Sequence, residues 1–284
     1  MRLRHLSTAV LALSLAGCAT PRTVGPSGSA HTADVFTARA EQVAAAWPGS
    51  PAEQAWQHEY IPLGNTDVLP PSTGPHADSD KQALIAGRLR VSVPLPTPPP
   101  TLTVRWKNGG KLALPALAPM RAANATTSGG GTRLTVTSVG LTTLTVPTSR
   151  GTASVPAWSI RLKGYQKPWV VAAVAPTMPG PPAVGPTGKP DPSLVTAGLD
   201  SVSADGRTLK LTLGEGDCGI KPSARVYETA DAVVVGGLET RKPSGDIPCT
   251  AQMIIIRLAV HLAAPLGART VLDAATGEPL APSS

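Results

Sequence analysis

The sequence predicts a mainly β fold: two small antiparallel β domains, sandwich- or meander-like, after a short N-terminal helical segment. Three observations support this prediction. From about residue 84 onward, apolar residues alternate with polar ones over many short stretches, as half-buried strands require. Turn signals separate these stretches, and the chain contains 28 Gly and 31 Pro. Aromatic residues make up only 3% of the chain, so the cores must come mainly from Val, Leu, Ile and Ala.

The N-terminus has the features of a secretory signal over residues 1–17. Arg2 and Arg4 precede an apolar run that is too short to span a bilayer as a mature helix. The run ends in Leu15-Ala16-Gly17-Cys18, which resembles the lipobox of bacterial lipoproteins. The resemblance implies cleavage before Cys18 and acylation of its thiol with chains such as palmitate. The alternative is an ordinary signal peptide with an incidental cysteine.

Acylation of Cys18 would fix the compartment of the mature chain. We expect a protein anchored in the cell membrane on its extracytoplasmic face, since several acyl chains hold a protein stably. That space is oxidising, so Cys218 and Cys249, the two remaining cysteines, are predicted to form a disulfide. Closing the loop between them would contribute about 3–4 kcal/mol on the chain-entropy model.

A helical segment is predicted over residues 34–60, after a flexible tether over 18–33. Phe36, Ala40, Val43 and Trp47 share one helical face. The stretch 50–53, Ser-Pro-Ala-Glu, has the pattern of a capping box and opens a second short helix. Residues 62–82 show no period and are predicted to be a loop.

The first β domain is predicted over residues 84–176. Alternation at 89–95 and 102–106 predicts two strands, and Asn108-Gly109-Gly110 turns the second into a hairpin with 111–114. The proline-rich stretch 94–100 must lie on an edge or in a loop. Further strands are predicted at 134–137, 141–146, 152–155, 158–162 and 169–175.

The second β domain is predicted over residues 193–284, after a Pro/Gly-rich linker at 177–192 that should act as a semi-rigid spacer. Asp205-Gly206 between two alternating runs gives the strongest hairpin signal of the chain. The run 252–262 is strongly apolar, which predicts a central strand. Strands are also expected at 225–229, 232–238 and 269–273.

Several longer motifs together resemble a group of uncharacterised actinobacterial lipoproteins. The shared features are the lipobox, a helical A-x-x-W start, the segment Arg150 to Trp158 (RGTASVPAW), the two-Cys C-terminal region and Pro265-Leu266-Gly267-Ala268-Arg269. The resemblance implies a cell-envelope location and a high-GC Gram-positive source. It assigns no role to any residue, Arg150 and Ser154 included.

Sequence motifs for catalysis are missing from the chain. There is no Gly-x-Ser-x-Gly, no Ser-x-x-Lys and no close histidine pair, so we expect no metal and no cofactor. The formal net charge is +7, but the basic residues are spread singly, so nucleic acid is not the expected partner. An anionic envelope polymer or a membrane protein fits better.

A non-enzymatic binding or structural protein of the envelope is therefore the expected function. Trp106, Trp158 and Trp169 are the candidate binding anchors by residue type, with core packing as the competing interpretation. One alternative is a cell-wall polysaccharide hydrolase that uses two carboxylates. Another is an extracytoplasmic sensory or regulatory partner of a membrane protein.

Overall fold

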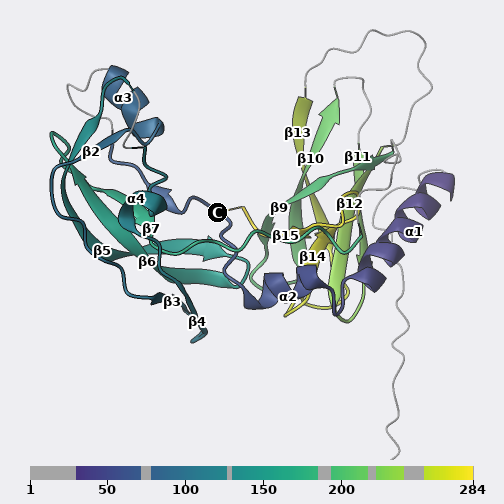
Figure 1. Ribbon diagram of the computed structural model, residues 1–284. Coiled ribbons are helices and arrows are strands. Elements are labelled where there is room, and N and C mark those ends of the chain that lie inside the picture. Colours follow the sequence, from purple (N-terminus) through teal and green to yellow (C-terminus); the bar gives the residue numbers. More distant parts are fainter. Residues whose placement is uncertain are drawn as a thin grey trace, which may run out of the picture.

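The computed structural model describes residues 30–71, 78–126, 130–184, 193–216, 222–239 and 253–283. It confirms the mainly β fold class, with a short helical segment before the sheets (Figure 1). Cys18, Cys218 and Cys249 lie outside the described residues, and so does the predicted disulfide. Within the described residues, no helix is both long and apolar enough to cross a bilayer.

The helices are α1 (Ala30–Ala46), α2 (Pro51–His58), α3 (Asp78–Ile85) and α4 (Pro119–Ala122). The strands of the middle domain are β1 (Asp67–Val68), β2 (Leu89–Val91), β3 (Thr101–Trp106), β4 (Lys111–Pro115), β5 (Leu134–Thr148), β6 (Gly151–Leu162) and β7 (Trp169–Ala172). The strands of the C-terminal sandwich are β8 (Leu194–Val195), β9 (Ala197–Val202), β10 (Thr208–Gly216), β11 (Pro222–Glu228), β12 (Ala232–Glu239), β13 (Met253–His261), β14 (Thr270–Asp273) and β15 (Pro279–Leu280).

The middle domain is built on one long hairpin. The stretches predicted as four short strands merge into β5 and β6, which pair antiparallel down to Thr148 opposite Gly151. Ser149 and Arg150 form the two-residue turn between them, and Gly151 has a φ of 93°, which favours glycine. The free side of β6 pairs with β3 near its start and with β7 near its end. This hairpin therefore places its turn at one end of the domain.

The sheets are mixed rather than purely antiparallel. β2 runs parallel to β5, and β12 runs parallel to β14. The predicted β3–β4 hairpin is confirmed, and the proline-rich residues 94–100 lie between β2 and β3, outside any strand. The stretch predicted as a loop over 62–82 contains β1 and the start of α3, which is a correction.

The C-terminal sandwich packs a three-stranded sheet, in the order β13-β10-β9, onto the sheet that contains β11, β12, β14 and β15. Alternate residues of the strands fill the space between the sheets. The buried members of this core are Ala197, Leu199, Leu209, Leu211, Leu213, Ala224, Val226, Val233, Val235, Val260, Leu262 and Val271. The Asp205-Gly206 turn joins β9 to β10 as predicted, with Gly206 at a φ of 70°.

Asp273 is a buried carboxylate in this core. Its Oδ1 accepts a hydrogen bond from the backbone N–H of Ala197 at 2.9 Å, which joins β14 to β9. Its Oδ2 accepts from the N–H and the hydroxyl of Thr276, both at 2.8 Å. Burial raises the pKa of Asp273, and these hydrogen bonds act in the opposite direction.

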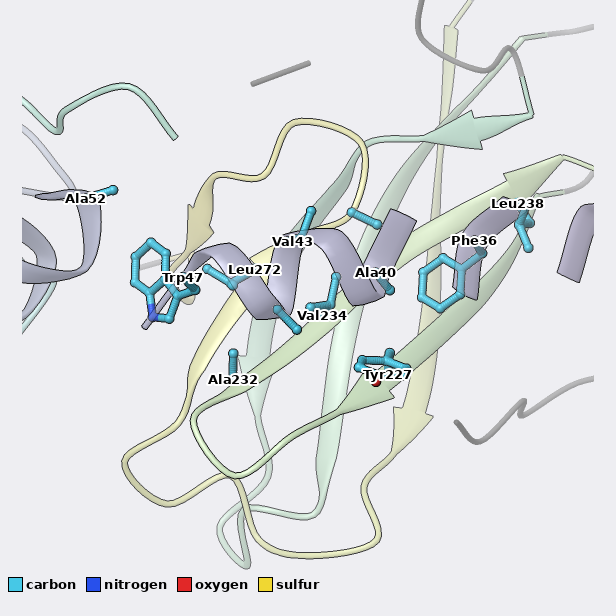
Figure 2. Close-up of a cluster of buried hydrophobic side chains, with 12 residues drawn as sticks. Phe36, Ala40, Val43, Trp47, Ala52, Tyr227, Ala232, Val234, Leu238 and Leu272 are labelled. Carbon is cyan, nitrogen blue, oxygen red and sulfur yellow. The ribbon is translucent and has the colours of Figure 1, made fainter. Parts of the chain in front are cut away.

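Helix α1 covers the outer face of the second sheet of the sandwich (Figure 2). The predicted stripe of Phe36, Ala40, Val43 and Trp47 is buried there. Its partners on the sheet are Tyr227, Ala232, Val234, Leu238, Leu272 and Ala274. Arg39 adds a polar tie, since its Nε donates to the carbonyl of Ala274 at 3.0 Å. The first helix thus belongs to the C-terminal sandwich, and the middle domain is inserted between them in the chain.

Helix α2 connects the two parts. Ser50 caps it by accepting a hydrogen bond from the N–H of Glu53 at 3.1 Å, as the capping box predicts. Trp56 of α2 packs against the core beneath α1, whereas the residues after α2 join the middle domain. There the N–H of Leu63 donates to the carbonyl of Pro147 at 2.9 Å. The end of α2 therefore lies where the two domains meet.

The strand β13 corrects the prediction of a central strand. It stands at the edge of its sheet and pairs with β10 alone among the described strands. Met253, Ile254 and Ile255 are 72%, 40% and 52% exposed. The apolar composition of β13 predicted that both of its faces are buried. The local sequence pattern does not show which strands pair with its two edges, so it could not predict that β13 lies at the edge of the sheet.

Candidate ligand-binding cleft

A cleft of about 860 Å³ lies between the middle domain and the C-terminal sandwich. Four segments of the chain form most of its walls: the end of α2, the turn of the β5–β6 hairpin, and the sandwich segments 266–271 and 280–282. Its polar lining side chains are Gln57, His58, Asn108, Thr148, Ser149, Arg150, Arg269 and Thr270. Its apolar lining includes Trp56, Leu63, Leu199, Val202, Leu266, Val271 and Leu280.

Thr148 organises the hairpin turn at this cleft. Its hydroxyl accepts from the indole Nε1 of Trp106 at 2.9 Å and from the backbone N–H of Arg150 at 3.2 Å. The same hydroxyl donates to the carbonyl of Gly151 at 2.7 Å. The side chain is 3% exposed, so these bonds are shielded from water. The turn is consequently fixed to β3, and the position of Arg150 follows from it.

Arg150 lies over the face of Trp106. Its guanidinium carbon is 3.8 Å from the ring centroid, within the range of a cation–π contact. Its Nη1 donates to the carbonyl of His58 at 2.8 Å, at the C-terminal end of α2 where helix carbonyls lack intrahelical partners. The stacking and this bond hold the guanidinium plane in one orientation.

Arg150 retains hydrogen-bonding capacity for a ligand. A guanidinium has five N–H groups, and the described residues accept from Nη1 alone. No acidic side chain among the described residues forms an ion pair with it. Fork-shaped donors of this kind bind carboxylate and phosphate groups in a bidentate manner.

Arg269, the second arginine of the cleft, is occupied within the protein. Its Nη1 pairs with the carboxylate of Glu228 at 2.9 Å. Its Nη2 donates to the carbonyls of Ala264 at 2.8 Å and Pro265 at 3.0 Å, and its Nε donates to Leu266 at 3.2 Å. Arg269 therefore stabilises the 264–269 turn, whereas Arg150 is the arginine available to a ligand.

No carboxylate is among the residues that line the cleft in the described part of the chain. Of the two arginines in its polar wall, Arg269 is paired with Glu228, which lies outside the cleft, so the positive charge at the cleft comes from Arg150. The arrangement suits an anionic ligand with an apolar or sugar-like body, which the Trp56 and leucine side chains can contact. Within the described residues, no cluster of three or more metal-ligating side chains is present.

The three tryptophans predicted as candidate anchors are core residues, which corrects that expectation. Trp106, Trp158 and Trp169 are 4%, 1% and 5% exposed. Their indole N–H groups are used internally: Trp158 donates to the carbonyl of Leu117 at 2.8 Å and Trp169 to Asp67 at 3.1 Å. A domain with few aromatic residues uses its large rings to fill the core. Trp106 alone of the three contributes at the cleft, as the platform beneath Arg150.

Arg150 was not predicted as a binding residue from the sequence. The sequence gives only a weak indication of its role. Arg150 lies in a Ser-Arg-Gly turn after a long run of alternating residues, and it is one of many basic residues that are spread singly along the chain. The ring of Trp106 lies 44 positions before Arg150 in the chain, so only the fold brings the two residues together.

Comparisons with protein-family models, with curated proteins and with solved structures found no match to the chain.

Proposed function

We propose that this chain is a lipid-anchored, extracytoplasmic protein of the cell envelope that binds an anionic envelope polymer through Arg150. The observation that carries the binding part is the guanidinium of Arg150, which is oriented by Trp106 and His58 and lines a cleft whose described lining residues include no carboxylate. Such a site favours phosphate or carboxylate groups over cations.

The anchoring part rests on the sequence before the described residues. Leu15-Ala16-Gly17-Cys18 follows a basic start and an apolar run, the order that lipoprotein signals share. Acylated Cys18 would hold the mature chain at the bilayer without a transmembrane helix. A protein held there meets the anionic polymers of the wall at high local concentration.

The charge of the mature chain supports the same ligand class. Removal of residues 1–17 takes away Arg2 and Arg4 and lowers the formal net charge from +7 to +5. A positive protein attracts polyanions from a distance, an effect that salt screens over about 8 Å at physiological ionic strength. Specificity then depends on the fixed donors of Arg150 rather than on the net charge.

The test uses the mature chain purified from its own membrane. Mass spectrometry of the N-terminal peptide should show an acylated Cys18, and an unmodified thiol would contradict the anchoring. Binding is then titrated with poly(glycerol phosphate), with oligogalacturonate and with uncharged dextran. The first two arms separate phosphate from carboxylate as the recognised group, and dextran should not bind.

Replacing Arg150→Ala should weaken binding of the anionic probe about 10- to 100-fold, since a hydrogen bond to a charged group contributes about 1.5–3 kcal/mol. Arg161→Ala is the matched control, because Arg161 is an exposed arginine on β6 outside the cleft and its loss changes the net charge equally. Equal weakening by both variants would show that net charge alone attracts the polymer and would refute the site.

A further inference from the structure

Where the end of β10 pairs with the start of β13, the sheet carries an exposed apolar surface, here called the apolar tip and defined as Met253, Ile254 and Ile255. These consecutive residues are 72%, 40% and 52% exposed. Successive strand residues point to opposite faces of a sheet, so both faces of β13 are apolar at its start. Three adjacent exposed large apolar side chains are unusual on an edge strand, where soluble proteins place charges.

The apolar tip and the first turns of α1 lie at the same end of the sandwich. Gly216, at the end of β10, pairs with Met253, and Glu239, at the end of β12, pairs with Pro222. Five residues separate Gly216 from Pro222, which allows a span of about 20 Å at most. The two sheets therefore end on the same side.

The orientation of α1 follows from its contacts with β12. A Cβ placed at Gly236 would lie 3.3 Å from the ring of Phe36, so the beginning of α1 covers the later part of β12. Trp47, at the other end of the stripe, lies near Ala232 at the start of that strand (Figure 2). Figure 1 shows the same arrangement, with the beginning of α1, the end of β10 and the start of β13 toward one side.

The point of membrane attachment is close to this end in the chain. Eleven residues lie between Cys18 and Ala30, the first residue of α1, and they reach about 40 Å at most. We propose that the apolar tip inserts into the interface of the bilayer that holds acylated Cys18, so that the lipid and the tip together orient the sandwich. This inference rests on the anchoring part of the proposed function.

Charged residues lie at different distances from the apolar tip along β10 and β13. Arg257 follows the tip along β13, Glu215 of β10 pairs directly with Ile254, and the basic residues Lys210 and His261 lie toward the far end of the two strands. The apolar side chains of the tip, rather than a basic cluster, are therefore the part that we expect to enter the bilayer interface. A second membrane contact would add to the single lipidated residue in holding the chain on the membrane.

The test places a fluorescent reporter at the tip. Ile255→Trp is compared with Leu141→Trp in the acylated mature chain, on vesicles of phosphatidylglycerol and phosphatidylethanolamine with brominated acyl chains. Both original side chains are 52% exposed, but Leu141 lies on β5 of the middle domain. The wild-type chain supplies the signal of the five native tryptophans for subtraction.

Bromine should quench the added emission at position 255 at least twofold and leave that at position 141 unchanged. Absence of quenching at 255 in a chain whose Cys18 is shown by mass to be acylated would overturn the tip insertion and leave the anchoring intact. An unmodified Cys18 would overturn both. A dimer in sedimentation velocity that Ile255→Asp dissolves, without quenching on vesicles, would instead assign the tip to a second copy of the chain.

Discussion

Tyr60 allows the packing of the middle domain to be tested through pH. The residue is fully buried beside Val104, Trp106 and Val146, and its hydroxyl has no hydrogen-bond partner among the described residues. Burial raises the pKa of Tyr60 from 10 to about 12, because the phenolate cannot be solvated there. The folded state therefore holds its proton over a range in which the unfolded chain releases it.

The sign and the size of the effect follow from this difference. The stabilisation is fully present below about pH 10 and is lost as pH rises toward about 12, since the folded pKa lies above the unfolded one. The difference between the folded and the unfolded pKa of Tyr60 corresponds to roughly 3 kcal/mol of unfolding free energy lost across this range. Tyr60→Phe removes the titrating group, so its unfolding free energy should lack this part of the alkaline decline.

The assay is denaturant unfolding of both proteins at steps from about pH 9 to about pH 12. Near neutral pH the variant should be equal to the wild type or up to about 1 kcal/mol more stable, because it no longer buries an unpaired hydroxyl. Parallel alkaline declines of the two proteins would refute the reasoning, as they would mean that Tyr60 ionises as freely as an exposed tyrosine.

The remaining predictions concern Thr148 and Gly277. Thr148→Val should lower the unfolding free energy by about 2–4 kcal/mol, because it leaves the buried Trp106 N–H without an acceptor. It should also weaken binding of the anionic probe, because the turn that holds Arg150 loses its hydrogen bonds to the Thr148 hydroxyl. Thr148→Ser should retain both stability and binding, which are measured by urea unfolding and by titration with the probe. Gly277→Ala should lower the unfolding free energy by at least about 2 kcal/mol, because Gly277 has a φ of 75° and a Cβ there would clash with the backbone carbonyl oxygen of Val184. Gly109→Ala is the control, with a φ of 92° and open space around it, and equal costs in thermal unfolding would contradict the close approach.

Local elements could be predicted from the sequence where one short-range rule decides them. The stripe of Phe36, Ala40, Val43 and Trp47 predicts α1, and Ser50 with Glu53 predicts the start of α2, because helix periodicity and capping depend on neighbours within a few residues. Turns at Asn108-Gly109 and Asp205-Gly206 were predicted for the same reason.

Long-range partners could not be predicted in the same way. The stripe of α1 shows that one face is buried, but the sheet it covers lies about 190 positions later in the chain. The run Met253–Ile256 has the composition of a central strand, yet its place at an edge depends on which strands pair with β10. The cleft has the same origin, since Arg150, His58 and Leu266 come from three distant segments.

The orientation of Arg150 toward its ligand is the central claim, and the nitrogen chemical shifts of the arginine side chains test it most directly. The ¹⁵N-labelled mature chain is titrated with poly(glycerol phosphate). The chemical shift of the Arg150 Nε–H signal should change progressively until the site is saturated. The Arg269 Nε–H signal should not move, because the N–H donors of Arg269 are occupied within the protein. A saturable shift confined to Arg269, or uniform small shifts of exposed arginines alone, would contradict the account.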